Sequence, residues 1–342
     1  MACLRSTTFT LEPSDTRPWA ILANCYTLAG SDDNVQGLTL VFFHGTGLCK
    51  ETWEPTLEEM FATAPRGLIR DAWCMEYPEN GDSGVINESR LAGRDLDHWG
   101  VRQYVDDAYD FLISKRHHPH AVDFSSRRLV LVGHSIGGTC AVLLHEKEPR
   151  LPIVGLVLHE ASIAPDSPAR QRIFEVLTNY YWTRRDAWSS REEAIKELSA
   201  HRAYSGWDPR VLDIHFKHVL CSHPAAKYPS PFNFTGVTTV MTRDMDSAVA
   251  RAPEPTGAAL QALPSVVRRT PTTLVFGDIE DLFPRESKEA QIGLVAFKGS
   301  RANVVTVEGV GHMAMQQRPK AFAKALVDSV QRLVKDTSGA KL

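Results

Sequence analysis

The chain has 342 residues, of which 43% are hydrophobic and 23% are charged, so it is long enough for one α/β domain with an insertion or for two domains. Its formal net charge of -3 gives no electrostatic basis for binding nucleic acid or an anionic membrane, whereas a small neutral or acidic substrate is compatible with it. The longest apolar runs are too short to span a bilayer, and the N-terminal residues lack the apolar core of a secretory signal, so we expect an intracellular protein that does not insert into a membrane.

The cysteines and the clustered histidines do not indicate a metal site. The six cysteines are scattered without a C-x-x-C pair, which is typical of reduced, buried thiols rather than disulfides or zinc ligands. His117, His118 and His120 lie close together, but they follow a predicted exposed helix and have no carboxylate cluster beside them. We therefore expect no metal and no cofactor.

The first half of the chain alternates between predicted strands and helices. Strands are expected at 7–13, 20–28 and 38–45, followed by a helix at 51–64, a strand that runs into a loop at 72–84 and a helix at 99–116. A buried strand at 129–132, a helix from 137 onward and another buried strand at 151–165 come next. This order predicts a mostly parallel, doubly wound sheet, whose chemistry lies at the carboxyl ends of the strands.

The alternation is interrupted between residues 166 and 264. This segment reads as helices at 168–185, 189–204 and 208–220 with proline-rich loops between them, and Ser190 with Glu193 forms a capping box for the second helix. Strands at 272–284 and 302–314 and a helix at 319–336 then resume the earlier pattern. We therefore expect an α/β core made of 1–165 and 265–342, with 166–264 as a helical lid over the carboxyl edge of the sheet.

The sequence Gly133-His134-Ser135-Ile136-Gly137 lies between a predicted buried strand and a predicted helix. A serine on such a sharp turn needs small neighbours, because larger side chains two positions away would collide with the strand and the helix. This G-x-S-x-G pattern in its strand–turn–helix context predicts that Ser135 is a nucleophile.

A serine nucleophile requires a base and donors for the developing oxyanion. His312 follows the last predicted strand in a glycine-rich loop and comes last in the expected chain order of serine, acid and histidine. The expected oxyanion donors are the backbone N–H of Ile136 and one from the loop after the strand at 38–45, which we assign to Thr46. His134 and His159, at strand ends, are expected to pack or to form hydrogen bonds.

The acid has two candidate positions. Glu160 ends the strand after the nucleophile helix, whereas Asp278, Glu280 and Asp281 follow the next core strand, where Gly277 and Pro284 bracket Glu280. Both strands are expected to lie on the same side of the nucleophile strand, so either strand end can bring a carboxylate behind the histidine.

The serine turn, His44-Gly45 and His312 together resemble the α/β-hydrolases. More closely, residues 42–61, 133–138 and 156–165 and the final Ala-Lys-Leu resemble fungal peroxisomal α/β-hydrolases of toxin and mycophenolic-acid-type biosynthesis, which include acyl-CoA hydrolases. The resemblance implies that the acid follows the strand after the nucleophile helix, and thus favours Glu160. It also implies acyl transfer to water, because related enzymes that open epoxides or remove halides carry an aspartate in place of Ser135.

The resemblance and the Ala340-Lys341-Leu342 terminus, a variant of the Ser-Lys-Leu signal, predict import into peroxisomes through the import receptor. The predicted substrate is a small acyl compound, and the predicted reaction is serine-dependent hydrolysis of an acyl-CoA thioester or an ester. The alternatives are an esterase or lactonase acting on a polyketide-like metabolite, a lyase or cyclase with the same triad, and a non-enzymatic ligand receptor.

The lid offers candidate substrate contacts. Its aromatic side chains could meet an apolar acyl group or form the lid's own core, and its cations could meet a carboxylate or the phosphates of coenzyme A. The aromatic candidates are Phe174, Tyr180, Tyr181 and Trp182, and the cationic ones are Arg184, Arg185 and Lys217. The oligomeric state is open.

Overall fold

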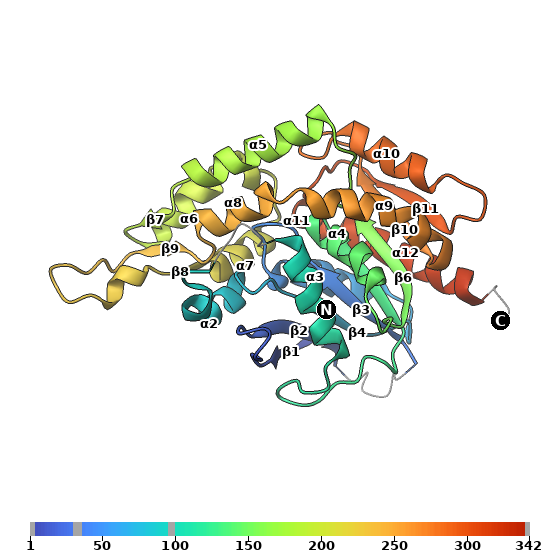
Figure 1. The fold of residues 1–342 in the computed structure, drawn as a ribbon, viewed down its shortest axis with the longest axis horizontal. Helices are drawn as coiled ribbons and strands as arrows, with labels where there is room; N and C mark the ends of the chain where they lie inside the picture. The colour runs from blue at the N-terminus through green and yellow to red at the C-terminus, as the bar shows by residue number, and fades with distance from the viewer. Residues whose placement is uncertain (1–3, 30–35, 95–99, 339–342) are drawn as a thin grey trace.

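The central sheet has eight strands in the order β1-β2-β4-β3-β5-β6-β10-β11. The computed structural model describes residues 4–29, 36–94 and 100–338 (Figure 1). The strands are β1 (Leu4–Leu11), β2 (Ile21–Leu28), β3 (Leu38–Phe43), β4 (Ile69–Met75), β5 (Leu129–His134), β6 (Ile153–His159), β10 (Thr272–Gly277) and β11 (Ala302–Val307). β1 pairs antiparallel with β2, and β2 with β4, while the other neighbours pair in parallel. The predicted mostly parallel sheet is confirmed.

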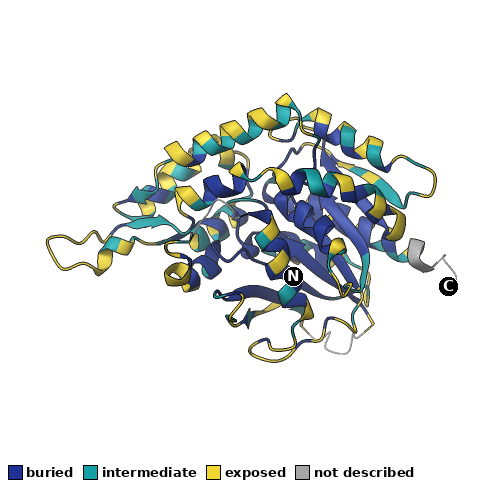
Figure 2. Cartoon of the chain, in the orientation of Figure 1, coloured by how far each residue is buried: buried dark blue, intermediate teal, exposed yellow. Residues whose placement is uncertain are grey.

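Helices cover both faces of this sheet, so its inner strands are buried on both sides (Figure 2). Successive side chains of a strand point to opposite faces: Phe43 packs against Tyr104, whereas Phe42 belongs to a second core cluster with Leu57 and Phe322. The first face carries α3 (Val101–Ile113), α4 (Ile136–Leu143) and α9 (Glu254–Arg269), and the second carries α1 (Glu54–Thr63) and α12 (Pro319–Ser338). The near-continuous apolar runs of these strands are what burial on two faces requires.

Helix α2 (Gly81–Leu91) follows β4, where the sequence predicts a loop. Its first residues are Gly-Asp-Ser-Gly, which are weak helix formers. Tertiary hydrogen bonds compensate: the Ser83 N–H donates to Glu76 Oε2 at 3.1 Å, and Asn87 Nδ2 donates to the Pro78 carbonyl at 3.1 Å. Two more helices in the core, α10 (Arg285–Val295) and α11 (Ala314–Gln317), flank β11, and short 3-10 helices lie at Lys50–Trp53, Leu144–Glu146, Arg202–Tyr204 and Pro224–Lys227.

The segment between β6 and α9, residues 166–251, is called the insertion below. It contains the predicted helices as α5 (Pro168–Thr183), α6 (Arg191–Ser199) and α7 (Pro209–Val219), together with α8 (Arg243–Arg251). The Ser190 side chain accepts a hydrogen bond from the Glu193 N–H and thus caps α6, as expected.

The segment expected as a helical lid at 166–264 contains strands as well as helices, and its last residues belong to a core helix. A small antiparallel sheet, β7 (Ala187–Trp188), β9 (Val237–Thr239) and β8 (Leu220–Ser222), lies within the insertion. Strands of two or three residues have no readable period, and these pair only across long stretches of chain. Residue 264 also falls inside α9, whose Leu263 and Val266 belong to the same core cluster as α4. None of the described helices is long and apolar enough to cross a bilayer.

Candidate active site

Ser135 lies on the turn between β5 and α4 with φ 55° and ψ -124°, a backbone conformation that non-glycine residues rarely adopt. Close approaches explain the flanking glycines. A Cβ on Gly133 would lie 2.5 Å from the Gly137 carbonyl oxygen, and a Cβ on Gly137 would lie 2.2 Å from the Phe43 carbonyl oxygen. The turn therefore accepts no larger residue at either position, and the strain at Ser135 is of the kind that functional sites retain.

His312 lies in the loop between β11 and α11, and its ring contacts Glu160. His312 Nδ1 is 3.2 Å from Glu160 Oε2, and both side chains are buried. Glu160 directly follows β6 with a left-handed φ of 39°. Burial by itself would raise the pKa of Glu160, but the hydrogen bond and the charge of His312, aided by Lys288, outweigh burial and lower the pKa to about 2. An ionised carboxylate at this position orients the imidazole and stabilises its protonated form.

The backbone of His312 is fixed from both sides. Its carbonyl oxygen accepts hydrogen bonds from His134 Nε2 at 2.9 Å and His159 Nε2 at 3.2 Å, while its N–H donates to Asp281 Oδ1 at 2.9 Å. Burial lowers the pKa of both His134 and His159. His159 also accepts the Ser135 N–H on its carbonyl at 3.1 Å, which links the serine turn to the histidine loop.

The carboxylates after β10 do not contact the His312 ring. Asp278 accepts from the Gly309 N–H at 2.8 Å, and Asp281 binds the His312 N–H, so both hold the loop backbone. Glu280 is exposed, and its nearest cationic partner is Arg285 at 4.0 Å. Of the two candidate positions for the acid, the geometry favours Glu160.

The loop after β3 passes next to the serine turn. A Cβ on Gly45 would lie 3.1 Å from Ser135 Cβ and 3.0 Å from His134 Nδ1, so a larger residue would require these neighbouring side chains to shift by a few tenths of an ångström. Thr46 follows it and is partly exposed. Ile136 is the first residue of α4, and helix geometry leaves its N–H without an intrahelical partner. No hydrogen bond between the Ser135 hydroxyl and the His312 ring occurs in the described part of the chain, and such bonds commonly tighten only when substrate binds.

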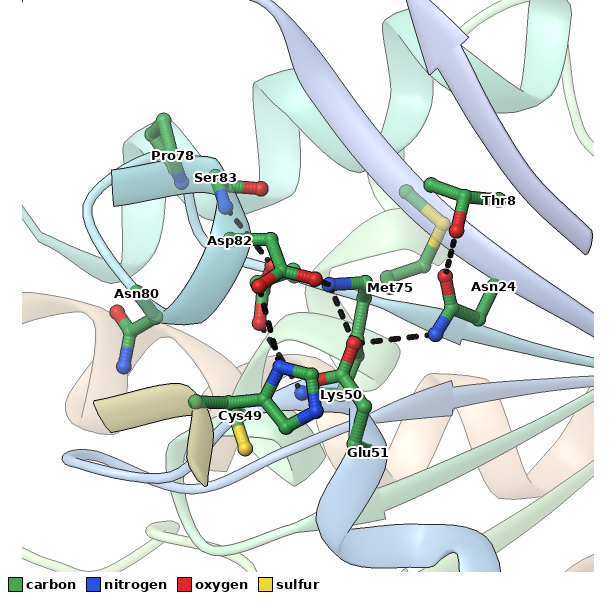
Figure 3. A network of polar contacts seen from close by, with 12 residues as sticks. Thr8, Asn24, Cys49, Lys50, Glu51, Met75, Pro78, Asn80, Asp82 and Ser83 are labelled. Carbon is green, nitrogen blue, oxygen red and sulfur yellow. Dashed lines mark hydrogen bonds and ion pairs between the residues drawn. The ribbon is translucent and has the colours of Figure 1, made fainter. Parts of the chain in front are cut away.

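A buried ion cluster, which sequence reasoning missed, holds the far end of this loop (Figure 3). Lys50 Nζ lies 2.6 Å from Glu51 Oε1, 2.8 Å from Glu76 Oε2 and 3.2 Å from Asp82 Oδ2, and its side chain is fully buried. Burial would lower the pKa of Lys50, but the three carboxylates raise it instead. Asn80 Nδ2 also donates to the Leu48 carbonyl at 2.7 Å, so the residues after β4 fix the loop on which Thr46 lies.

Helix α7 of the insertion reaches the same cluster through His218. Its Nδ1 is 3.1 Å from Asp82 Oδ1, and although burial lowers the pKa of His218, the hydrogen bond to Asp82 and the nearby carboxylates raise it overall. Glu51, Asp82 and His218 together offer cation ligands within 4.8 Å of one another. The Lys50 ammonium, however, already supplies a positive charge in contact with Glu51 and Asp82.

The cationic and aromatic side chains of the insertion that the sequence suggests as substrate contacts differ from one another in burial and in partners. Arg184 is partly buried and forms an ion pair with buried Asp246 at 2.8 Å, and Arg185 pairs with two carboxylates of α6. Lys217 is exposed, and the side chains of the four aromatic candidates range from buried Tyr181 to exposed Trp182. The insertion instead meets the site through Trp207 and Val211, which form one apolar cluster with Leu48 and the partly buried Met313. Sequence reasoning missed this cluster, because its members are far apart in the chain.

The chain is similar to a known family and to several known proteins. The model of the alpha/beta hydrolase family matches residues 40–325. The type I acyl-CoA thioesterase mpaH of Penicillium brevicompactum is 33% identical over 201 residues, which are 56% of this chain and 42% of that protein. The peroxisomal membrane protein LPX1 of Saccharomyces cerevisiae is 31% identical over 116 residues, which are 33% of this chain and 28% of that protein. These alignments span less than half of either relative.

Solved structures share the fold over nearly the whole chain. The peroxisomal alpha-beta-hydrolase Lpx1 of Saccharomyces cerevisiae has a TM-score of 0.74 at 18% identity and covers 99% of this chain and 91% of its own. The thioesterase domain from the curacin biosynthetic pathway has a TM-score of 0.64 at 15% identity, with 96% and 99% covered. Since the family model covers most of its length, this chain belongs to the alpha/beta hydrolase family.

Proposed function

We propose that this protein is a serine hydrolase that cleaves an acyl-CoA thioester, or a related ester, through an acyl-enzyme. The observation that carries the proposal is the 3.2 Å contact between His312 Nδ1 and Glu160 Oε2, on a loop linked by hydrogen bonds to the strained turn of Ser135. A serine at its ordinary pKa is a poor nucleophile, and a histidine oriented by a carboxylate is the base that activates it.

In the proposed reaction, Ser135 Oγ attacks the acyl carbon while His312 Nε2 takes the hydroxyl proton. The N–H groups of Thr46 and Ile136 donate to the oxyanion of the tetrahedral intermediate. His312 then returns the proton to the departing sulfur or oxygen, which leaves the acyl group on Ser135. Water, whose proton His312 takes, then attacks the acyl carbon; the bond to Ser135 Oγ breaks, His312 returns the proton to Oγ, and the acid departs while Glu160 stays ionised.

We propose a thioester rather than another acyl compound as the substrate because the relatives from Penicillium carry the name acyl-CoA thioesterase. We also propose a role in a fungal secondary-metabolite pathway, as the resemblance given in the sequence analysis implies, and a peroxisomal location, which the peroxisomal relative from Saccharomyces supports. Ala340, Lys341 and Leu342, through which the import receptor would bind, lie outside the described residues.

The test is hydrolysis of matched acyl-CoA thioesters, simple esters and lactones by the wild-type protein and by Ser135→Ala, measured as kcat/KM. We expect thioesters to be preferred and turnover to fall about 10⁴-fold or more in Ser135→Ala and equally in His312→Ala, because triad members act as a unit. Faster turnover of esters or lactones would replace the thioester assignment, and turnover that does not depend on Ser135 would refute the serine mechanism.

A further inference from the structure

Lys288 of α10 contacts the carboxylate that pairs with His312. Its Nζ lies 2.9 Å from Glu160 Oε1 and 2.8 Å from the Gly277 carbonyl oxygen, and the side chain is buried. The Gly277 N–H donates to the same Oε1 at 3.0 Å. Glu160 thus has one oxygen on the His312 ring and the other held by two donors at the end of β10.

A buried lysine is costly unless its charge and its donors are satisfied. The apolar side chains near the end of β10, Phe276 and Phe283, offer no such partner, so the carboxylate of Glu160 and the Gly277 carbonyl are what retain the ammonium. The arrangement also has a geometric effect. With Oε1 held by two donors, the carboxylate cannot rotate freely, and Oε2 stays directed at His312 Nδ1.

We propose that Lys288 is a positioning residue of the active site: it acts through Glu160, keeping Oε2 on the His312 ring and offsetting part of the negative charge felt there. The proposal rests on the proposed function, since it assigns Lys288 a role only if His312 is the base. Lys288 itself touches neither Ser135 nor the oxyanion loop in the contacts of the described residues.

The charge effect has a definite sign. Without the Lys288 charge, the negative charge of Glu160 beside the His312 ring is no longer partly offset, so the acidic limb of the pH profile of kcat/KM should move to higher pH. The other titratable groups that face this pair are His134, His159 and Asp281, and they remain the same in every Lys288 variant.

The experiment compares Lys288→Met, Lys288→Gln and Lys288→Arg by the pH profile of kcat/KM. In Met and Gln we expect the acidic limb to move up by about half a pH unit or more, and kcat to fall roughly tenfold with little change in KM. Lys288→Arg keeps the positive charge, so the acidic limb of its pH profile should stay at the wild-type position. Lys324→Met, which removes an exposed lysine of α12, is the control and should leave the profile unchanged.

A double-mutant cycle with Glu160→Gln distinguishes action through Glu160 from a general loss of packing. In the Glu160→Gln background, Lys288→Met should cost no further activity, because the carboxylate it would position is gone. An unmoved acidic limb in both Met and Gln, or a full additional loss in the double variant, would overturn the proposal. If Lys288→Met does not fold, the position of the acidic limb of the kcat/KM profile is measured in Lys288→Gln instead. Retained turnover in Ser135→Ala would instead mark failure of the proposed function itself.

Discussion

At the scale of single residues, the proposal that Glu160 is the acid paired with His312 rests on the positions of two carboxylates relative to the His312 ring. Glu160 is completely buried and in contact with His312, whereas Glu280 lies on the surface near Arg285. An amide at position 160 can still accept a hydrogen bond, but it cannot stabilise a positive charge on His312 during proton transfer.

We therefore expect Glu160→Gln to lower kcat by about 10³-fold or more, and Glu280→Gln to leave it within about twofold. Steady-state kinetics on the same thioester, with folding checked by circular dichroism, measures both. Glu280→Gln is the matched control, since it removes a carboxylate that touches no catalytic group. The opposite ranking would show that the acid follows β10.

At the scale of elements, the ion cluster around Lys50 connects three parts of the fold: the loop after β3, the start of α2 and helix α7 of the insertion. The contacts of His218 on α7 with Asp82, at 3.1 Å, and with Glu51, at 3.8 Å, are ion pairs that depend on a proton on His218. The groups that face His218 are Asp82, Glu51 and Lys50, with His215 beside it on α7.

The pairing makes the docking of α7 dependent on pH. Because the pKa of His218 is raised in the folded protein, the stabilisation is fully present below the ordinary histidine value near 6.5 and is lost as the pH rises through the raised value. We expect amide hydrogen exchange in α7, corrected for intrinsic rates, to accelerate over this interval relative to α3.

His218→Gln should remove this pH dependence, since glutamine does not titrate. His118→Gln serves as the control, because His118 is an exposed histidine far from α7 in sequence. Equal pH dependence of exchange in wild type and His218→Gln would contradict a role for this ion pair in holding α7.

At the scale of the whole molecule, the fold is shared with solved structures over nearly its full length, although identity to them is below 20%. Fold likeness of this kind leaves substrate and location undetermined, because one scaffold hosts many activities.

We expect deletion of Leu342 to move the protein from peroxisomes to the cytosol without changing the kcat/KM of the purified enzyme. The reason is that a Ser-Lys-Leu-type signal is recognised at the terminal residues, whereas the proposed catalytic residues lie in the core. Fluorescence microscopy of N-terminally tagged variants measures location, and Ala340→Ser, which creates Ser-Lys-Leu, should remain peroxisomal. An unchanged location after deletion would refute import through this tripeptide.

The sequence by itself determined the order of the eight strands of the central sheet along the chain, the turn at Ser135 and the loop position of His312. Each depends on residues within a few positions of one another, such as the apolar run of β5 followed by glycines around Ser135. The helix α2 and the strands β7, β8 and β9 escaped prediction, because distant contacts override weak local preference there.

Only the tertiary structure decided which carboxylate meets His312, since β6 and β10 are neighbours that end at the same edge of the sheet. It also brought Lys288 to Glu160, and Lys50 and His218 to Asp82, across separations of the chain that no local pattern encodes. Buried charges can persist only in such pairs, so the three-dimensional arrangement, rather than residue type or spacing, selects their partners.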